Sequence, residues 1–280
     1  MPLLRSRFSE MTQQNRLTEA TYVRGAALSA RFDLTGRVAL VIGGTRGIGG
    51  AIAEGFADAG ADVAVVGRSA ESLDEAVSRL EATGAKAHGI SADVGNREDR
   101  ARIVSEAVDA LGKVDILVNC AGAKPLRGDM LDRDPGVFES LLHVNVLPYY
   151  ELSIAAARGM KERSWGRIIN LSSATGLKAR SGMGEYAITK AAEIMMTRAF
   201  AVELGSSGIT VNAIAPILTR TGFSSAQLKD ESDVERVLAA QVIKRIAEPE
   251  DVVGAALLLA SDAGGFITGS TLVLDGGALA

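Results

Sequence analysis

The sequence is poor in three residue types that carry much of protein chemistry. Its 280 residues include 1 Cys and 2 His, and aromatic residues make up 4%. A single cysteine excludes an intrachain disulfide and indicates a reducing compartment, and two histidines leave little material for a metal site or a hydrolytic triad. Few aromatic side chains and a net charge of -4 disfavour nucleic-acid binding, which needs base stacking and phosphate neutralisation.

Long hydrophobic runs are also missing. The most apolar stretch, residues 254–260, is far shorter than the ~18 residues needed to cross a bilayer, and the first residues lack the apolar block of a secretory signal. We therefore expect a cytoplasmic protein with no membrane span. Residues 1–33 predict a flexible extension, or a segment upstream of an alternative start at Met11, and residues 34–280 predict a single domain.

Short apolar runs alternate with amphipathic segments along that domain. Strands are predicted at 37–42, 62–66, 86–91, 114–118, 167–171, 209–214 and 271–274, and helices at 47–59, 70–83, 97–111, 136–163, 185–204 and 249–260. Strands that are apolar on both faces and separated by helices predict an α/β Rossmann fold, a doubly wound parallel sheet covered by helices on both faces. The stretch 217–233 lacks such a pattern and predicts a lid or binding loop.

Glycine is the abundant residue, and its placement is informative. The chain has 31 glycines, where an average of ~7% predicts about 20. The segment Gly43-Gly44-Thr45-Arg46-Gly47-Ile48-Gly49 joins the first strand to a helix. Glycines allow a ligand to approach the backbone closely, and a helix N-terminus favours a phosphate. A glycine-rich turn between strand and helix therefore predicts a dinucleotide site.

The end of the second strand bears on which dinucleotide is bound. Gly67-Arg68-Ser69 holds no acidic residue for the adenosine ribose hydroxyls. Arg68 and Arg46 are instead suited to a ribose 2′-phosphate, because the guanidinium matches phosphate geometry. We favour NADP(H) and leave NAD(H) possible; the alternative is two solvated surface arginines.

Residues after the later strands complete the expected cleft. Asp93-Val94 and Asn119-Cys120-Ala121-Gly122 follow the third and fourth strands. We interpret Cys120 as a buried small side chain rather than a nucleophile, since its neighbours are apolar. Tyr186 and Lys190 share one face of a predicted helix, where the ammonium favours the phenolate. Such a tyrosine can act as general acid and base between an alcohol and a carbonyl.

At this point the chain resembles the short-chain dehydrogenase/reductase family over about residues 33–280. The matching segments are VIGGTRGIGG, ADV, NCAG, HVNV, INLSSATG, YAITK, VNAIAP and ITGSTLVLDGG. The resemblance implies a seven-stranded parallel sheet of order 3-2-1-4-5-6-7, a nicotinamide cofactor, a small alcohol or ketone substrate, and a homotetramer or homodimer.

The resemblance also implies roles for individual residues. Tyr186 is the expected acid/base, Ser173 (rather than Ser172) binds the substrate oxygen, Lys190 holds the nicotinamide ribose, and Asn145 positions a water in the proton relay. Besides Tyr186 and Lys190, the cofactor contacts are expected at Gly43, Thr45, Arg46, Gly47, Ile48, Gly49, Arg68, Asp93, Val94, Asn119, Ala121, Gly122, Pro216, Ile217 and Thr219, with Thr221 as a further candidate. The chain departs from the family pattern at Ile42, where threonine is frequent, and at Ile217, where glycine is usual.

We therefore expect interconversion of a secondary alcohol and a ketone, and two alternatives stay open. A 3-oxoacyl-carrier-protein reductase would need a basic docking surface, for which Lys124, Arg127, Lys178, Arg180 and Arg220 are candidates. The same residues would also suit a small acidic or sugar-like substrate, or would simply be solvated. The other alternative is a dinucleotide-binding sensor or scaffold without catalysis.

Overall fold

Seven parallel strands form the centre of the domain, in the order β3-β2-β1-β4-β5-β6-β7. They are β1 (Val38–Ile42), β2 (Asp62–Gly67), β3 (Ala87–Ser91), β4 (Ile116–Asn119), β5 (Gly166–Leu171), β6 (Ile209–Pro216) and β7 (Thr271–Leu274). The fold and the strand order agree with the prediction. The computed structural model describes residues 26–124 and 127–280, and Phe32–Ala280 form one compact unit.

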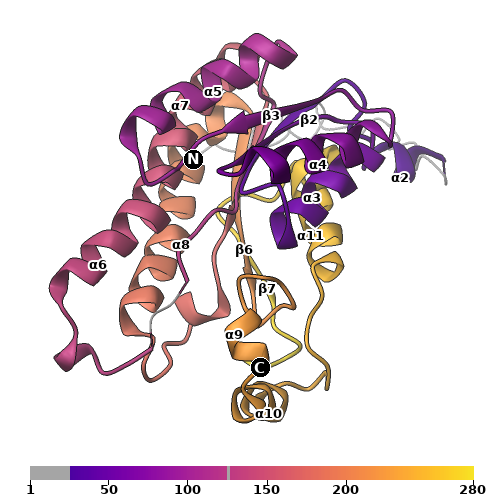
Figure 1. Ribbon diagram of the computed structural model, residues 1–280. Coiled ribbons are helices and arrows are strands. Elements are labelled where there is room, and N and C mark those ends of the chain that lie inside the picture. The colour runs from indigo at the N-terminus through magenta and orange to yellow at the C-terminus, as the bar shows by residue number, and fades with distance from the viewer. Residues whose placement is uncertain (1–25, 125–126) are drawn as a thin grey trace, which may run out of the picture. The chain divides into compact units, whose positions relative to one another are not determined.

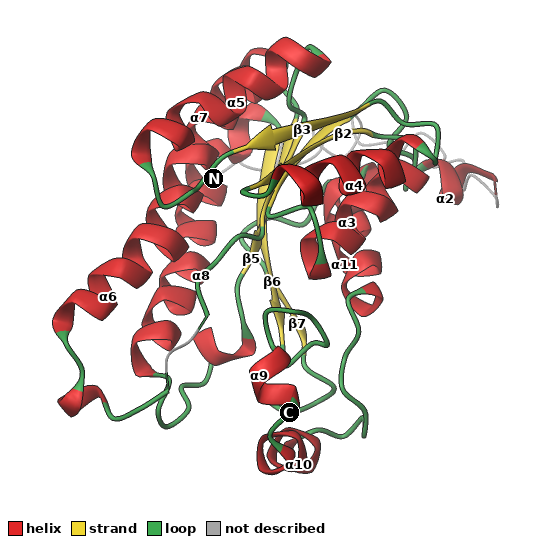
Figure 2. Cartoon of the chain, viewed as in Figure 1, coloured by secondary structure: helices red, strands yellow, loops and turns green. Residues whose placement is uncertain are grey.

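Helices cover both faces of the sheet, as Figures 1 and 2 show. One layer holds α3 (Gly47–Asp58), α4 (Ala70–Glu81) and α11 (Glu250–Ala260), and the other holds α5 (Arg97–Leu111), α7 (Leu147–Glu162) and α8 (Gly184–Leu204). Alternate strand residues point to opposite layers, so Val41 packs against the first and Leu40 against the second. This arrangement explains why a central strand such as β1, VALVI, is apolar and buried on both faces.

One helix prediction and one loop prediction were wrong in detail. The predicted helix 136–163 is divided into α6 (Pro135–Leu141), a π-helical turn (Leu142–Val146) and α7. Pro148 lies at the start of α7 and has no N–H for the preceding turn, which accounts for the interruption. The stretch 217–233 contains α9 (Ser225–Leu228) and the start of α10 (Glu231–Ala240), whose first amides are capped by the Asp230 side chain.

The amino-terminal segment is described only in part. It includes a short helix, α2 (Ala26–Ala30), while most of the predicted flexible extension, residues 1–25, and the alternative start at Met11 lie outside the described residues. Across the described ranges, no helix is long and apolar enough to cross a membrane.

Candidate active site

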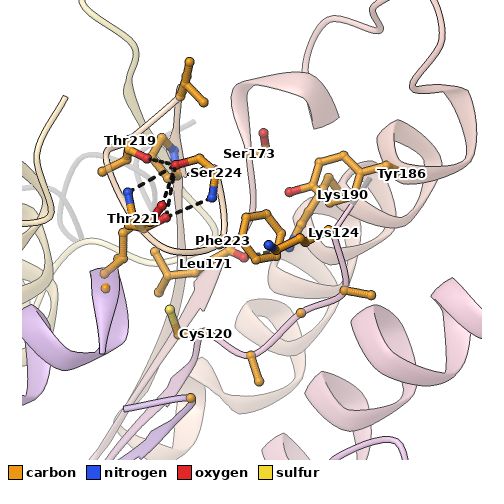
Figure 3. Close-up of a pocket in the computed structure, with 18 of the residues that line it drawn as sticks. Cys120, Lys124, Leu171, Ser173, Tyr186, Lys190, Thr219, Thr221, Phe223 and Ser224 are labelled. Carbon is orange, nitrogen blue, oxygen red and sulfur yellow. Dashed lines mark hydrogen bonds between the residues drawn. The ribbon is translucent and has the colours of Figure 1, made fainter. Parts of the chain in front are cut away.

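A large cavity of about 1490 Å³ lies at the carboxyl ends of the strands. This is where doubly wound sheets bind ligands, because the loops after the strands diverge there. Most of the predicted site residues line it, and Figure 3 shows part of this lining. The predicted residues on its wall are Gly43, Thr45, Arg46, Gly47, Ile48, Gly49, Arg68, Asp93, Val94, Ala121, Gly122, Ser173, Tyr186, Lys190, Pro216, Ile217, Thr219 and Thr221.

The glycine loop forms one end of the cavity, and two of its positions, Gly43 and Gly49, must lack a side chain. Gly43 has φ +77, and a Cβ there would lie 3.0 Å from the Ala121 amide nitrogen. A Cβ on Gly49 would lie 2.3 Å from the Gly43 carbonyl oxygen, which no side chain tolerates. Helix α3, which begins here, has no side-chain cap, whereas Ser69 caps α4 and Asn96 caps α5. The uncapped amides of α3 fit the pyrophosphate of a dinucleotide.

The next part of the cavity combines two arginines with a carboxylate. The exposed side chains of Arg46 and Arg68 line it together with Asp93. The Arg68 guanidinium lies 3.9 Å from the Asp93 carboxylate, and both side chains are mostly exposed. An ion pair of this length and exposure is weak, so Arg68 can turn toward a ligand.

Ser173, Tyr186 and Lys190 meet at the other end. Ser173 follows β5 and is followed by a single turn of helix, while Tyr186 and Lys190 lie on α8 (Figure 3). The Tyr186 ring centroid is 5.6 Å from Lys190 Nζ. Both α8 side chains are nearly buried, with 8% and 5% of their surface exposed, so their charges interact with little screening by water.

The surroundings act on the pKa of Tyr186 in opposite directions. Burial raises this pKa and outweighs the Lys190 ammonium, which lowers it; Glu193 raises it further and a hydrogen bond with Ser173 lowers it. Burial also raises the pKa of the Cys120 thiol to about 12, so this cysteine is not a thiolate at neutral pH. In the protein without a cofactor, Tyr186 therefore keeps its proton and can act as a proton donor.

Two predicted site residues lie behind the cavity instead of on its wall. Asn119 was expected to line the cleft, but its side chain is fully buried and donates to Asn170 Oδ1 at 2.9 Å and Ser153 Oγ at 3.3 Å. The Asn119 side chain thus turns toward the α7 layer and does not line the cavity, and its contact with a cofactor stays a prediction. Asn145 is fully buried in the π-helical turn; its Oδ1 accepts from the Ala123 amide at 2.7 Å and its Nδ2 donates to Thr189 Oγ1 at 3.0 Å.

The segment after β6 closes the cavity from the side. Ile217 is buried and packs with Val237 of α10 and Ile246, so the larger residue anchors the lid where the family usually has glycine. The Thr219 hydroxyl donates to the Ile217 carbonyl at 2.9 Å. Ile42, the other departure, is a buried core residue. Lid and site are thus joined through one small apolar cluster.

The basic residues near the lid have different environments. Lys124 donates to the Gly222 carbonyl at 3.1 Å and Arg127 pairs with Asp233 of α10 at 2.5 Å. Arg220 pairs with Glu248 and does not line the cavity. Lys178 and Arg180 line it on the side of Ser173 and have no acidic partner among the described residues.

Sequence reasoning missed one charged residue of this centre. Glu193 is fully buried and its carboxylate lies 2.8 Å from Lys190 Nζ. The spacing of three residues on a predicted helix was a signal for this pair. The spacing could not reveal that both groups are buried.

The comparisons with known proteins agree with this geometry. The protein-family model described as enoyl-(acyl carrier protein) reductase matches residues 42–278. Dehydrogenase/reductase SDR family member 4 of Bos taurus is 37% identical over 90% of this chain and 90% of that protein. The chain thus has the fold and cavity of a dinucleotide-binding oxidoreductase. It belongs to the short-chain dehydrogenase/reductase family, whose members bind NAD(P).

Solved structures extend the comparison. A gluconate 5-dehydrogenase from Burkholderia cenocepacia, in complex with NADP and tartrate, is 32% identical with a TM-score of 0.86, covering 90% of this chain and 98% of the other. A 3-oxoacyl (acyl-carrier-protein) reductase from Agrobacterium tumefaciens, with NADP bound, is 34% identical with a TM-score of 0.85, covering 91% and 99%. Relatives of similar distance thus differ in their substrates.

Proposed function

We propose that this protein is an NADP-dependent oxidoreductase that interconverts a secondary alcohol and a ketone. One observation carries the proposal: the uncapped glycine loop and the group of Ser173, Tyr186 and Lys190 line the same cavity. A bound nicotinamide supplies or accepts the hydride. A cofactor whose pyrophosphate lies on the α3 amides can extend along the cavity toward Tyr186.

The residues of this chain handle the proton and the substrate oxygen. The Ser173 and Tyr186 hydroxyls hold that oxygen between them, and Tyr186 donates its proton as the carbonyl becomes an alcohol. In the other direction the tyrosinate accepts the proton. Lys190 stabilises the tyrosinate and binds the nicotinamide ribose. We keep a water relay at Asn145 as part of the proposal.

The preference for NADP rests on Arg46 and Arg68. Arg46 lies in the glycine loop, Arg68 follows β2, and both line the cavity. No carboxylate directly follows β2, and two structural relatives are described with NADP bound. The positive charge of Arg46 and Arg68 favours the 2′-phosphate of NADP. Comparing kcat/KM for NADPH and NADH with one substrate tests this preference, and equal values would contradict it.

The reaction itself is tested with a substrate panel. Consumption of NADPH is followed by the absorbance of the reduced nicotinamide, with simple ketones, keto-sugars, keto acids and 3-oxoacyl thioesters as substrates. We expect turnover of at least one ketone class and formation of the corresponding alcohol. A protein that binds NADPH but turns over none of these would support the sensor or scaffold alternative.

A second candidate is a 3-oxoacyl-carrier-protein reductase. Lys124, Arg127, Lys178 and Arg180 line the cavity on its substrate side, and one structural relative is described as such an enzyme. The same charges suit a small substrate with a carboxylate. Turnover of the acyl-carrier thioester but not of small keto acids would favour the reductase. We also expect a homotetramer or homodimer, which sizing in solution tests.

A further inference from the structure

Behind the catalytic group lies a buried carboxylate that the proposed mechanism does not use. Glu193 follows Lys190 by one turn of α8 and has no exposed surface. Its two carboxylate oxygens accept hydrogen bonds from Lys190 Nζ at 2.8 and 3.0 Å. It does not line the cavity, so it cannot bind a ligand directly.

This contact uses the whole hydrogen-bonding capacity of the lysine. An ammonium has three N–H donors. Two point to Glu193, and the third is directed to the Leu171 carbonyl at 3.1 Å. Lys190 is therefore held in one position at the cavity wall, with all three N–H donors directed to protein acceptors. To donate to a ribose hydroxyl it must release one of these three acceptors.

The pair has few charged neighbours. The other titratable groups that face it are Tyr186 on α8, Tyr149 on α7 and Cys120 after β4, and the Ser172 hydroxyl after β5 donates to the Lys190 carbonyl at 2.8 Å. Tyr149 donates its own hydroxyl to the Leu171 carbonyl at 3.0 Å. Among the described residues around the pair, no second cation balances Glu193, so its charge acts mainly on Lys190 and Tyr186.

We propose that Glu193 is a positioning residue whose carboxylate neutralises Lys190 and thereby extends to higher pH the range in which Tyr186 is a proton donor. An unpaired lysine would stabilise the tyrosinate; a lysine paired within 3 Å of a carboxylate stabilises it much less. The effects of the two charges on the pKa of Tyr186 agree with this proposal, since Lys190 lowers that pKa and Glu193 raises it. The proposed consequence for catalysis rests on the proposed function.

The test is Glu193→Gln, which removes the charge and keeps the shape. Because Tyr186 and Lys190 titrate as a coupled pair, the measured quantity is the first apparent pKa of the pair. Loss of one buried negative charge predicts a decrease of roughly one to two units. Glu193→Asp retains the charge and should keep the higher value. Ile194→Val, a change at the neighbouring buried residue, serves as the control for altered packing.

Two readouts separate this proposal from the proposed function. The first is the ultraviolet difference titration of tyrosinate in the protein without cofactor, from which the titration of the matching Tyr186→Phe protein is subtracted, since the chain has 4 tyrosines. The second is the pH profile of kcat/KM. A protein without turnover would refute the proposed function and leave the first readout intact. The proposal fails if Glu193→Gln leaves the apparent pKa unchanged or raises it.

A neutral variant can fail to fold, because it leaves the buried Lys190 ammonium unpaired. Glu193→Leu is then the second neutral variant and carries the same prediction. If neither folds, the wild-type difference titration tests a necessary condition of the proposal, since burial also raises the pKa of Tyr186. Tyr186 must ionise at higher pH than an exposed tyrosine, and ionisation at or below that value overturns the proposal.

Discussion

The two ends of the cavity are built from different materials. At the glycine loop, the groups available to a ligand are the uncapped backbone amides of α3, and a side chain at Gly49 is excluded by a contact of 2.3 Å. At α8, the working groups are side chains, and their environment is set by buried partners such as Glu193 and Thr189. Substitutions at the glycine loop should therefore act through steric clashes and weaker cofactor binding. Substitutions at the α8 end should act through charge and proton transfer.

The strongest test of the backbone-built end is Gly49→Ala. The added methyl would collide with the Gly43 carbonyl, so the loop and the start of α3 must move. We expect a loss of about 2 kcal/mol or more in the free energy of unfolding, measured in urea, and at least tenfold weaker NADPH binding. An alanine variant with wild-type affinity would show that the loop does not hold the cofactor.

Asn145→Ala tests the contact that joins the loop after β4 to α8. Asn145 links the Ala123 amide, after β4, to Thr189 on α8, and its loss leaves buried polar groups unpaired. We expect about 1–3 kcal/mol of destabilisation, with weaker cofactor binding and lower kcat together. If only cofactor binding or only kcat changes, this contact does not couple the two.

Arg68→Ala should have a smaller and more selective effect. The side chain is exposed and only weakly paired with Asp93, so its removal should barely change the Tm. We expect kcat/KM to fall about tenfold for NADPH, corresponding to about 1.4 kcal/mol, and to stay nearly constant for NADH. An equal decrease with both cofactors would contradict a 2′-phosphate contact.

The smallest expected effect is that of Gly254→Ala, which serves as the matched control for Gly49→Ala. Gly254 lies within α11, and a Cβ there would meet nothing within 4 Å. Alanine is the better helix former, so the free energy of unfolding should rise by up to about 1 kcal/mol, with unchanged activity. A decrease in stability would mean that the helix needs this glycine.

The contrast between the two ends of the cavity also explains which features could be predicted from the sequence. The glycine loop was predictable because glycine has a direct steric meaning between a strand and a helix. The Tyr186–Lys190 pair was predictable from helical spacing and the family resemblance. The placement of Asn119 was not, because the direction of a side chain at a strand end depends on register and on the helices packed nearby.

Charge networks and interrupted helices were the other limits. Glu193 looks like an ordinary helix residue until the packing of α8 places it inside the protein. The π-helical turn that holds Asn145 comes just before Pro148, and hydrophobic periodicity does not record such an interruption. Helix α10 has a short apolar face and was hidden in a polar stretch. For Glu193 and α10, tertiary packing decided where the residues lie.

The central claim is that Tyr186 carries the proton while the cofactor is held mainly by other residues, and one paired measurement on Tyr186→Phe tests it most directly. The dissociation constant for NADPH and the rate of ketone reduction are measured on the same preparation of the variant. We predict wild-type affinity, because the α3 amides are untouched, and a rate lowered by about 10²–10⁴-fold or more. A variant that binds NADPH normally and reduces the ketone at the wild-type rate would contradict the account.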